Sequence, residues 1–315
     1  MKILFISSGN NQFGISPIVF NQGESLKQNK IEVAYLTVKG KGLFGYLKNV
    51  PRIRSKTKTN NYDLIHAHYS LSALAATLSF PKIPLVVSLM GTDSKMNLFW
   101  RTIIKLCYIL FWQKVIVKSK EMTDNLKLNK AVVIPNGVRF EKFDFIKKEE
   151  AKIKLGLDIN KRYILFLSNP SRYEKNYKLA ETAVNLINDN SVELLAVFNK
   201  EHSDVVNYLY AADVLLITSL WEGSPNAVKE AMVCNLQVVS TVVGDVKWLF
   251  GNEPGHYLAS FDPTDVVAKI KSALIFSEKY GHTNGRKRIL ELGLDSKTVA
   301  KKIINVYKEV LNISA

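Results

Sequence analysis

The stretch VLLITSLWEGSPNAVKEAM, residues 214–232, contains a strand, a loop and the start of a helix. Its first four residues are apolar, which predicts a buried strand at 214–217. Ser224 is suited to cap a helix and Pro225 to occupy the first helical position, so a helix is expected to follow the loop directly. In parallel α/β sheets, the loops that follow the strands bind ligands. The stretch therefore predicts the ligand-binding edge of such a sheet.

Similar apolar runs recur on both sides of this stretch. They lack strict alternation, as expected of parallel strands that are covered on both faces. They lie at 3–6, 33–36, 64–65, 85–87, 115–117 and 132–134 in the first half, and at 164–167, 194–198 and 238–239 in the second. Helical patterns such as 178–187 and 266–276 separate them. The chain is therefore predicted to be an α/β protein with two parallel sheets.

A turn signal at 134–138 and the charged stretch 139–154 mark the expected domain boundary. We predict an N-terminal domain at 1–140 and a C-terminal domain at 141–295. Residues 296–315 carry a last helix that is apolar on one face and rich in lysine on the other. That helix needs a surface to cover, and the N-terminal domain is the candidate.

The positive charge is concentrated in the first half of the chain. The formal net charge of the 315 residues is +15. Residues 1–150 hold 23 basic and 10 acidic side chains, and the remainder holds 20 and 18. Only the first half is therefore expected to face a polyanion or an anionic membrane surface.

The cysteines and the apolar segments suggest where the protein acts. Two cysteines far apart in the sequence indicate neither a disulfide framework nor a zinc site, and they favour a reducing compartment. The apolar run 3–6 is too short for a signal peptide, and the run 106–112 is shorter than the about 20 residues that cross a bilayer. We expect a cytoplasmic protein that is peripheral at the inner face of the membrane.

Two glutamates stand at the predicted ligand edge. Glu222 precedes the helix and Glu230 lies within it, a separation of roughly 12 Å at the helical rise. This distance is too long for a hydrolytic acid/base pair. It suits hydroxyl groups of two sugars joined by a diphosphate, whose phosphates would meet the helix N-terminus. The alternative is a capped surface helix with two solvated glutamates.

Several short motifs together resemble one family over nearly the whole chain. They are His66–His68, Gly91–Asp93, Ile134–Val138, Glu174–Asn176, Ala212–Val214, Glu222–Asn226, Glu230–Met232 and Val242–Val246. The chain resembles the retaining glycosyltransferases of family 4, which have the GT-B fold of two Rossmann-like domains facing a central cleft. The resemblance implies a hexosyltransferase of the polysaccharide biosynthesis type. It also implies a nucleotide-diphosphate-sugar donor, with no metal and no cofactor.

The resemblance also implies roles for individual residues. Glu230 would hold the donor ribose, and Arg172 with Lys175 would hold the diphosphate. Glu222 would hold the transferred sugar together with the backbone N–H groups of Gly223, Ser224, Pro225 and Asn226. The family usually has a Gly-Arg pair where this chain has Asn169-Pro170. Arg172 is the substitute candidate, and a solvated loop arginine is the alternative.

The first domain offers weaker candidates. Gly9 and Gly14 border a loop that lies at the interdomain cleft in the family. The alternative is that both glycines only permit a tight turn. His68 ends a strand and is either a catalytic polar group at the cleft or a structural histidine. Met90 stands where the family usually has a histidine before Gly91. That departure weakens any mechanism that requires an imidazole at this position.

Two segments are candidates for a membrane-facing helix. Residues 39–58 contain seven basic side chains and no acidic one, with Leu43, Phe44 and Leu47 interleaved at roughly helical spacing. This pattern is typical of a basic amphipathic helix at a membrane interface, and a solvated helix face is the alternative. The aromatic-rich segment 98–112 is instead expected to be a core helix with a buried stripe.

We therefore expect a glycosyltransferase that acts on a glycan or lipid-linked acceptor, with an anionic membrane surface as a partner and no nucleic-acid partner. Two alternatives stay open. One is a GT-B-fold sugar-nucleotide epimerase, and the other is a non-catalytic protein that binds glycans or a membrane surface. The presence of both Glu222 and Glu230 favours an enzyme.

Overall fold

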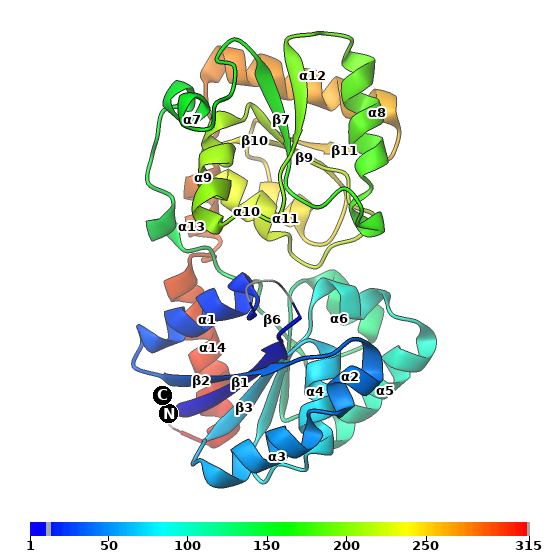
Figure 1. The fold of residues 1–315 in the computed structure, drawn as a ribbon, viewed down its shortest axis with the longest axis vertical. Coiled ribbons are helices and arrows are strands. Elements are labelled where there is room, and N and C mark those ends of the chain that lie inside the picture. Colours follow the sequence, from blue (N-terminus) through cyan, green and yellow to red (C-terminus); the bar gives the residue numbers. More distant parts are fainter. Residues whose placement is uncertain (11–13, 314–315) are drawn as a thin grey trace. The chain divides into compact units, whose positions relative to one another are not determined.

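The computed structural model describes residues 1–10 and 14–313, except for the side chain of Ser94. The chain folds into two compact units (Figure 1). The first comprises residues 1–137 and the C-terminal segment from Ser296, and the second comprises residues 138–295. The C-terminal helix thus belongs to the first unit, and the first boundary lies at 137 rather than at 140.

The described part of the first unit contains a parallel sheet of order β2-β1-β3-β4-β5-β6. Its strands are β1 (Lys2–Ser8), β2 (Glu32–Val38), β3 (Leu64–His68), β4 (Leu85–Ser88), β5 (Lys114–Val117) and β6 (Val132–Val133). Its helices are α1 (Pro17–Lys27), α2 (Gly42–Leu47), α3 (Val50–Thr59), α4 (Ser70–Leu78), the 3-10 helix η1 (Gly91–Lys95), α5 (Leu98–Leu110), α6 (Lys120–Leu126) and α14 (Ser296–Leu311). Strands β1, β3 and β4 are almost completely buried, as their continuous apolar runs predict.

The second unit is also built on a parallel sheet, of order β11-β10-β9-β7-β8. Its strands are β7 (Arg162–Phe166), β8 (Val192–Ala196), β9 (Val214–Ile217), β10 (Gln237–Thr241) and β11 (His256–Ala259). Its helices are η2 (Phe140–Lys142), α7 (Lys148–Lys154), η3 (Tyr173–Lys175), α8 (Tyr177–Ile187), α9 (His202–Ala211), α10 (Asn226–Val233), α11 (Val246–Phe250), α12 (Pro263–Tyr280) and α13 (Gly285–Glu291). The fold class predicted from the sequence, two parallel α/β sheets, is confirmed.

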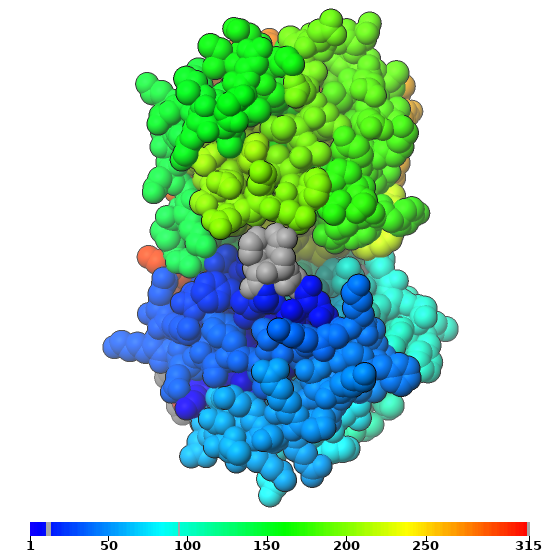
Figure 2. Space-filling model, viewed as in Figure 1, coloured from blue at the N-terminus to red at the C-terminus, as the bar shows by residue number. Residues whose placement is uncertain are grey.

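The basic segment 39–58 does not form the single helix that its pattern predicts. It forms α2 and α3, which are separated at Lys48 and Asn49 and belong to the surface seen in Figure 2. Tyr46 and Ile53 are buried in the core of the first unit, and Leu43 packs against that core. Phe44 is 80% exposed. The basic side chains are therefore presented without the row of exposed apolar residues that insertion into a membrane would need.

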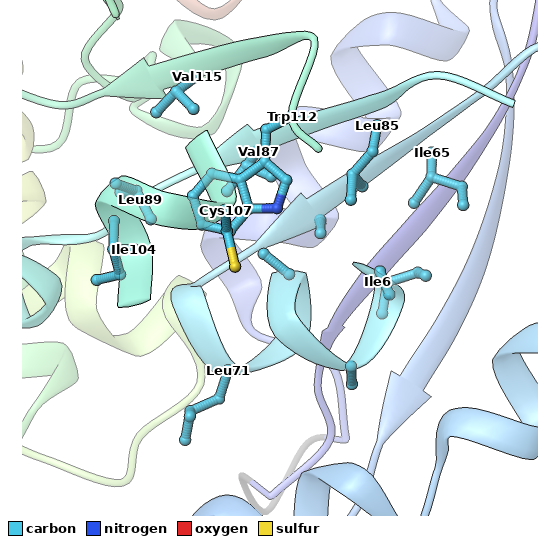
Figure 3. Close-up of a cluster of buried hydrophobic side chains, with 14 of the residues drawn as sticks. Ile6, Ile65, Leu71, Leu85, Val87, Leu89, Ile104, Cys107, Trp112 and Val115 are labelled. Carbon is cyan, nitrogen blue, oxygen red and sulfur yellow. The ribbon is translucent and has the colours of Figure 1, made fainter. Parts of the chain in front are cut away.

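Helix α5 exposes more apolar side chains than expected of a core helix. Its buried side is narrow, with Ile104 and Cys107 as its fully buried members. Figure 3 shows these two side chains beside Trp112 in a cluster that includes Leu89. The indole Nε1 of Trp112 donates to Thr77 Oγ1 over 2.9 Å. The predicted buried stripe is present, because Trp100, Ile103 and Tyr108 also pack against the core. The stripe takes up half of the apolar residues of α5, and the other half lie on its exposed side, namely Leu98, Phe99, Leu106, Ile109 and Leu110. None of the described helices is long and apolar enough to span a membrane.

Helix α14 is fixed to the sheet of the first unit by a buried hydrogen bond. It packs beside α1, and Val299, Ile303 and Tyr307 on its inner face are buried. The Tyr307 hydroxyl lies 2.5 Å from His66 Nδ1 on β3. The C-terminal helix therefore completes the core of the first unit.

Replacing Tyr307 with phenylalanine should lower the free energy of unfolding by about 1–3 kcal/mol, because His66 Nδ1 loses its partner in a buried environment. Urea unfolding followed by circular dichroism measures this change. Tyr280→Phe on α12 is the control, since Tyr280 is 56% exposed. Equal effects of the two substitutions would show that the buried hydrogen bond contributes nothing.

Candidate active site

The candidate site of the second unit lies where three neighbouring strands end. Strands β7, β9 and β10 are adjacent in the sheet (Figure 1). The segments that follow them are 167–176, 218–225 and 242–245. Because the strands are parallel, these segments meet at the carboxyl edge, where α/β sheets bind ligands.

Side-chain hydroxyls tie the three segments to one another. The one O–H of Thr218 is shared between the carbonyl oxygens of Lys175 and Asn176, each 3.0 Å from Oγ1. Thr241 Oγ1 donates to the carbonyl of Ser219 over 2.8 Å. Both threonines are almost completely buried. Buried hydrogen bonds of this kind fix the backbone of the site before any ligand binds.

Glu222 is held at this edge by two side chains. Lys175 Nζ forms an ion pair with Glu222 Oε1, and Ser219 Oγ donates to the same oxygen over 2.8 Å. The side chains of Lys175 and Glu222 are 20% and 16% exposed. Two candidates that are 47 positions apart in the sequence are therefore in direct contact.

The helix after Glu222 begins one residue later than predicted. Pro225 is the capping residue and α10 starts at Asn226. Ser224 does not cap it, because its Oγ accepts a hydrogen bond from Lys229 Nζ over 3.1 Å. Proline has no backbone N–H, so Pro225 cannot donate to a sugar or phosphate, which corrects its predicted role. Gly223, Ser224 and Asn226 remain as backbone donors in this segment.

Lys229 and Asp245 are two buried charged residues that influence each other electrostatically and that the sequence analysis did not single out. Burial lowers the pKa of Lys229 to about 8, against the attraction of Asp245 and Glu230. Burial likewise raises the pKa of Asp245 to about 6, although Lys229 lowers it. Lys229 stands next to Glu230 in α10, and no sequence motif marks it as buried. Its hydrogen bond to Ser224 places a cation beside the loop of Glu222.

Gly244 allows the loop after β10 to approach the loop of Glu222. Its φ is +55°, and a Cβ atom at this position would lie 2.5 Å from the carbonyl oxygen of Gly223. A side chain would therefore meet rigid backbone. Gly156 is a matched position, because its φ is +68° and nothing lies within 4 Å of its Cβ site.

Gly244→Ala should lower both stability and glycosyltransferase turnover, because it pushes the Gly223 loop away. Gly156→Ala, the control, should lower stability by about 1 kcal/mol through backbone strain alone and leave turnover unchanged. Thermal unfolding and initial rates measure the two effects. If both variants lose the same stability and keep full turnover, the close approach at Gly244 does not shape the site.

Glu230 has a partner that no sequence motif indicates. His202 Nε2 lies 3.2 Å from Glu230 Oε1, and the His202 ring stands edge-to-face against Phe143. His202 is the first residue of α9, which follows β8. The two residues are 28 positions apart with no local pattern between them, so only the fold joins them.

Arg172 lies next to the site but pairs locally. Its Nε donates to Glu174 Oε1 over 2.8 Å, and its side chain is 51% exposed. Arg172 and Lys175 stand at opposite ends of the same short segment, which includes η3. The structure thus brings together Lys175 and Glu222, whereas the guanidinium of Arg172 is directed to Glu174.

His68 in the first unit is fully enclosed. Its ring stacks on that of His66, with 4.2 Å between the ring centres, as alternate residues of a strand permit. Burial holds the pKa of both imidazoles well below the usual value, and the charge of Lys118 acts in the same direction. Neither ring nitrogen of His68 has a hydrogen-bond partner within the described residues. His68 is therefore a neutral imidazole, and Lys118 is a buried neighbour that the sequence analysis missed.

Gly9 and Gly14, which border the first loop, have different surroundings. Gly9 N donates to the Val38 carbonyl over 2.8 Å, and a Cβ atom at Gly9 would lie 2.8 Å from Cβ of Thr37. Gly9 is therefore required for close packing on β2. Gly14 has a φ of +78° with open space around it. Residues 11–13 between them lie outside the described part of the chain.

Asp93 organises the segment that contains Met90. Its carboxylate is fully buried and accepts hydrogen bonds from the backbone N–H groups of Met90, over 2.7 Å, and Ser70, over 3.3 Å. Burial raises the pKa of Asp93 to about 6. The carboxylate thus joins the start of η1 to the start of α4.

The contribution of Asp93 to stability should increase as the pH falls. Because its pKa is higher in the folded than in the unfolded chain, the folded chain binds an additional proton between about pH 4 and pH 6. The unfolding free energy of the wild type relative to Asp93→Asn should rise by about 1–3 kcal/mol as the pH is lowered from about 7 to about 4. Urea unfolding followed by tryptophan fluorescence at several pH values tests this. A difference that stays constant, or that grows with rising pH, would contradict it.

Two family models match the chain, one in each unit for most of its length. The model described as glycosyltransferase family 4 matches residues 14–142, and the model described as glycosyl transferases group 1 matches residues 170–275. The second range contains Lys175, Glu222 and Glu230. Among the described residues, no group of three His, Cys, Asp or Glu side chains is arranged to hold a metal ion.

Curated relatives and solved structures agree with these matches. The chain is 27% identical over 219 residues to a putative teichuronic acid biosynthesis glycosyltransferase of Bacillus subtilis, which covers 60% of this chain and 55% of that protein. It is 26% identical over 267 residues to an Escherichia coli alpha-1,3-galactosyltransferase, covering 70% of this chain and 68% of the other. Sucrose-phosphate synthase from Thermosynechococcus elongatus has the same fold, with a TM-score of 0.84 at 16% identity and full coverage of both chains. HepE from Anabaena, in complex with UDP and glucose, has a TM-score of 0.74 at 18% identity and covers 97% of this chain and 99% of its own.

The protein is therefore a glycosyltransferase of the family 4 type, and its fold is GT-B. The match to the first relative spans about half of that protein's length.

Proposed function

We propose that this protein transfers a hexose from a nucleotide-diphosphate-sugar to a glycan or lipid-linked acceptor, with retention of the anomeric configuration and without a metal ion. The observation that carries the proposal is the contact of Glu222 with Lys175 and Ser219 directly before α10. Both contacts use Oε1 of Glu222. Its other oxygen, Oε2, is the acceptor that we assign to a hydroxyl of the transferred sugar.

The positive charge around Glu222 suits a departing diphosphate. Lys175 supplies a cation in contact with Glu222, and Arg172 supplies a second at the other end of η3. The first turn of α10 adds backbone N–H groups and the positive end of a helix dipole. Fixed donors of this kind stabilise the negative charge that develops on the leaving phosphate, and such stabilisation is often the largest catalytic contribution. We assign to these groups the role that a metal ion has in other phosphate sites.

The reaction that we propose is a front-face substitution. The bond between the anomeric carbon and the phosphate oxygen breaks, and a bond from the acceptor oxygen to that carbon forms on the same face. The acceptor proton passes to the departing phosphate oxygen, so no separate protein base is needed. The protein then acts mainly by orienting the two substrates and by stabilising charge.

Glu230 is assigned to the ribose of the donor. It lies in the second turn of α10, and His202 fixes one of its oxygens. A contact with the ribose is made equally in the ground state and in the transition state. Such a contact affects the binding of the donor more than the rate of the chemical step.

The names of the relatives support the substrate classes. The Escherichia coli relative is named for a UDP-Gal donor and a diphosphoundecaprenol-linked acceptor, and the Bacillus subtilis relative for teichuronic acid biosynthesis. Both names describe the extension of a polysaccharide or of a lipid-linked glycan. On this basis we propose a nucleotide-sugar donor and a lipid-linked or polymeric acceptor for the present chain.

Glu222→Gln should lower kcat by at least about 100-fold with a small change in the KM for the donor, because it removes a charge that acts at the sugar. Glu230→Gln should raise the KM for the donor about 10-fold or more with a smaller change in kcat. A panel of nucleotide sugars with a lipid-phosphate acceptor, followed by mass spectrometry of the product, first identifies the donor. Steady-state rates with that donor then separate the two effects.

The control for both variants is Glu181→Gln, because Glu181 lies on the surface of α8 and pairs with Lys178. It should behave as the wild type. Wild-type kinetics for both Glu222→Gln and Glu230→Gln would overturn the site. Nuclear magnetic resonance of the anomeric proton in the product tests retention, and full activity in the presence of a chelator tests the absence of a metal requirement.

A further inference from the structure

Helix α5 exposes a continuous row of large apolar side chains. They are Leu98, Phe99, Leu106, Ile109 and Leu110, which are 79%, 66%, 54%, 65% and 59% exposed, and we call this set the α5 face. Their spacing places them on one side of the helix, opposite the buried Ile104 and Cys107. A helix that is apolar on both sides is normally enclosed by protein or by lipid. One side of α5 is covered by the core of the first unit, and the α5 face has no cover within the described residues.

The apolar surface continues past the end of the helix. Phe111 is 45% exposed and Phe80, after α4, is 68% exposed. These two side chains and Leu110 help to line a cavity of about 230 Å³. The φ of Phe80 is +49°, which is unfavourable for an aromatic residue, and this backbone conformation places Phe80 at an exposed position. Contiguous exposed apolar surface of this kind marks an interaction site.

Basic residues outnumber acidic ones in the part of the chain that contains the α5 face. From Leu78 to Lys118 the chain has six basic residues and one acidic residue, Asp93, which is buried. Of the six, Lys118 is buried, and Lys95 and Lys114 form ion pairs with Glu121 and Glu309. Arg101 and Lys105 lie at the edge of the α5 face, and no carboxylate in the described part of the chain forms an ion pair with either. Beyond the C-terminal end of α5, Lys114, Lys127 and Lys130 help to line a second cavity, of about 400 Å³.

We infer that the α5 face is the surface with which this protein docks on a membrane that contains anionic lipids. Its apolar side chains match the acyl boundary of a bilayer, and the basic residues match phosphate headgroups at the same depth. A second copy of the chain fits less well, because symmetric contact would bring the basic residues at the edges of two α5 faces together. The inference rests on the first unit alone and does not depend on the donor chemistry proposed for the second.

The inference assigns the apolar contact to α5 and not to the segment 39–58. Tyr46 and Ile53 of that segment are buried in the core. Helices α2 and α3 therefore expose basic side chains, and Phe44 is their one strongly exposed large apolar residue. Segment 39–58 can add attraction that salt screens, whereas the α5 face adds burial of apolar surface that salt does not remove. The two segments therefore predict different responses to mutation.

The test is sedimentation of the full chain with vesicles of phosphatidylcholine alone and of phosphatidylcholine with about 30% phosphatidylglycerol. The wild type should bind the anionic vesicles at least about 10-fold more tightly than the neutral ones, and a part of the binding should persist in high salt. Leu106→Asn with Ile109→Asn should lower the binding to anionic vesicles by about 10-fold or more and remove the salt-resistant part. Arg101→Gln with Lys105→Gln should lower the binding at low salt.

Two matched double variants serve as controls. Phe145→Asn with Ile153→Asn removes apolar residues of the second unit that are 82% and 69% exposed, and should leave the binding unchanged. Arg52→Gln with Arg54→Gln removes charge from α3 and should leave the salt-resistant part unchanged. Circular dichroism verifies that each variant is folded.

Three results would overturn the inference. The first is a wild type that binds neither type of vesicle. The second is binding that the Leu106 and Ile109 substitutions leave unchanged while the α3 substitutions abolish it. The third is a wild-type dimer, seen by light scattering, that the same α5 substitutions convert to a monomer without any vesicle binding.

Discussion

The hydrogen bonds of two buried threonines are the constraint on which the candidate active site depends. Thr218 joins the loop after β9 to the loop after β7, and Thr241, the last residue of β10, joins that strand to the loop after β9. The backbone N–H of Leu220 adds a bond to the Glu174 carbonyl over 2.8 Å, so Lys175 and Glu222 are carried by loops that are fixed to each other. Since the strands below are adjacent and parallel, short loops and two hydroxyl groups are sufficient to bring a cation and a carboxylate together.

Each unit also buries charged side chains near the carboxyl ends of its strands. In the second unit, Lys229 and Asp245 offset part of the desolvation that each would otherwise suffer alone. In the first unit, the carboxylate of Asp93 is stabilised by the backbone N–H groups of Met90 and Ser70. Such groups lower stability compared with an apolar core, but they fix the direction of the neighbouring loops. That loss of stability is acceptable where loops must be held still for a reaction.

In the first unit, the helices with the most basic surface differ from the helix with the most exposed apolar surface. Helices α2 and α3 present lysine and arginine while burying Tyr46 and Ile53, and α5 presents leucine, isoleucine and phenylalanine beside Arg101 and Lys105. The basic side chains and the exposed apolar side chains are therefore carried mainly by different helices of the first unit. In the docking that we propose, this arrangement would combine long-range attraction to an anionic surface with short-range apolar contact.

The sequence by itself determined the two parallel sheets and the position of the Glu222 loop, because apolar runs and turn residues are local signals. It also placed Glu222 and Glu230 on one loop and helix. Only the tertiary structure decided that Lys175 contacts Glu222, that His202 contacts Glu230 and that Lys229 faces Asp245, since these partners come from different strands and loops. It also decided which side of α5 is buried. A helix with apolar residues on both sides has no clear periodic signal to show which side meets the core. The side with Ile104 and Cys107 packs there, and the α5 face is left exposed.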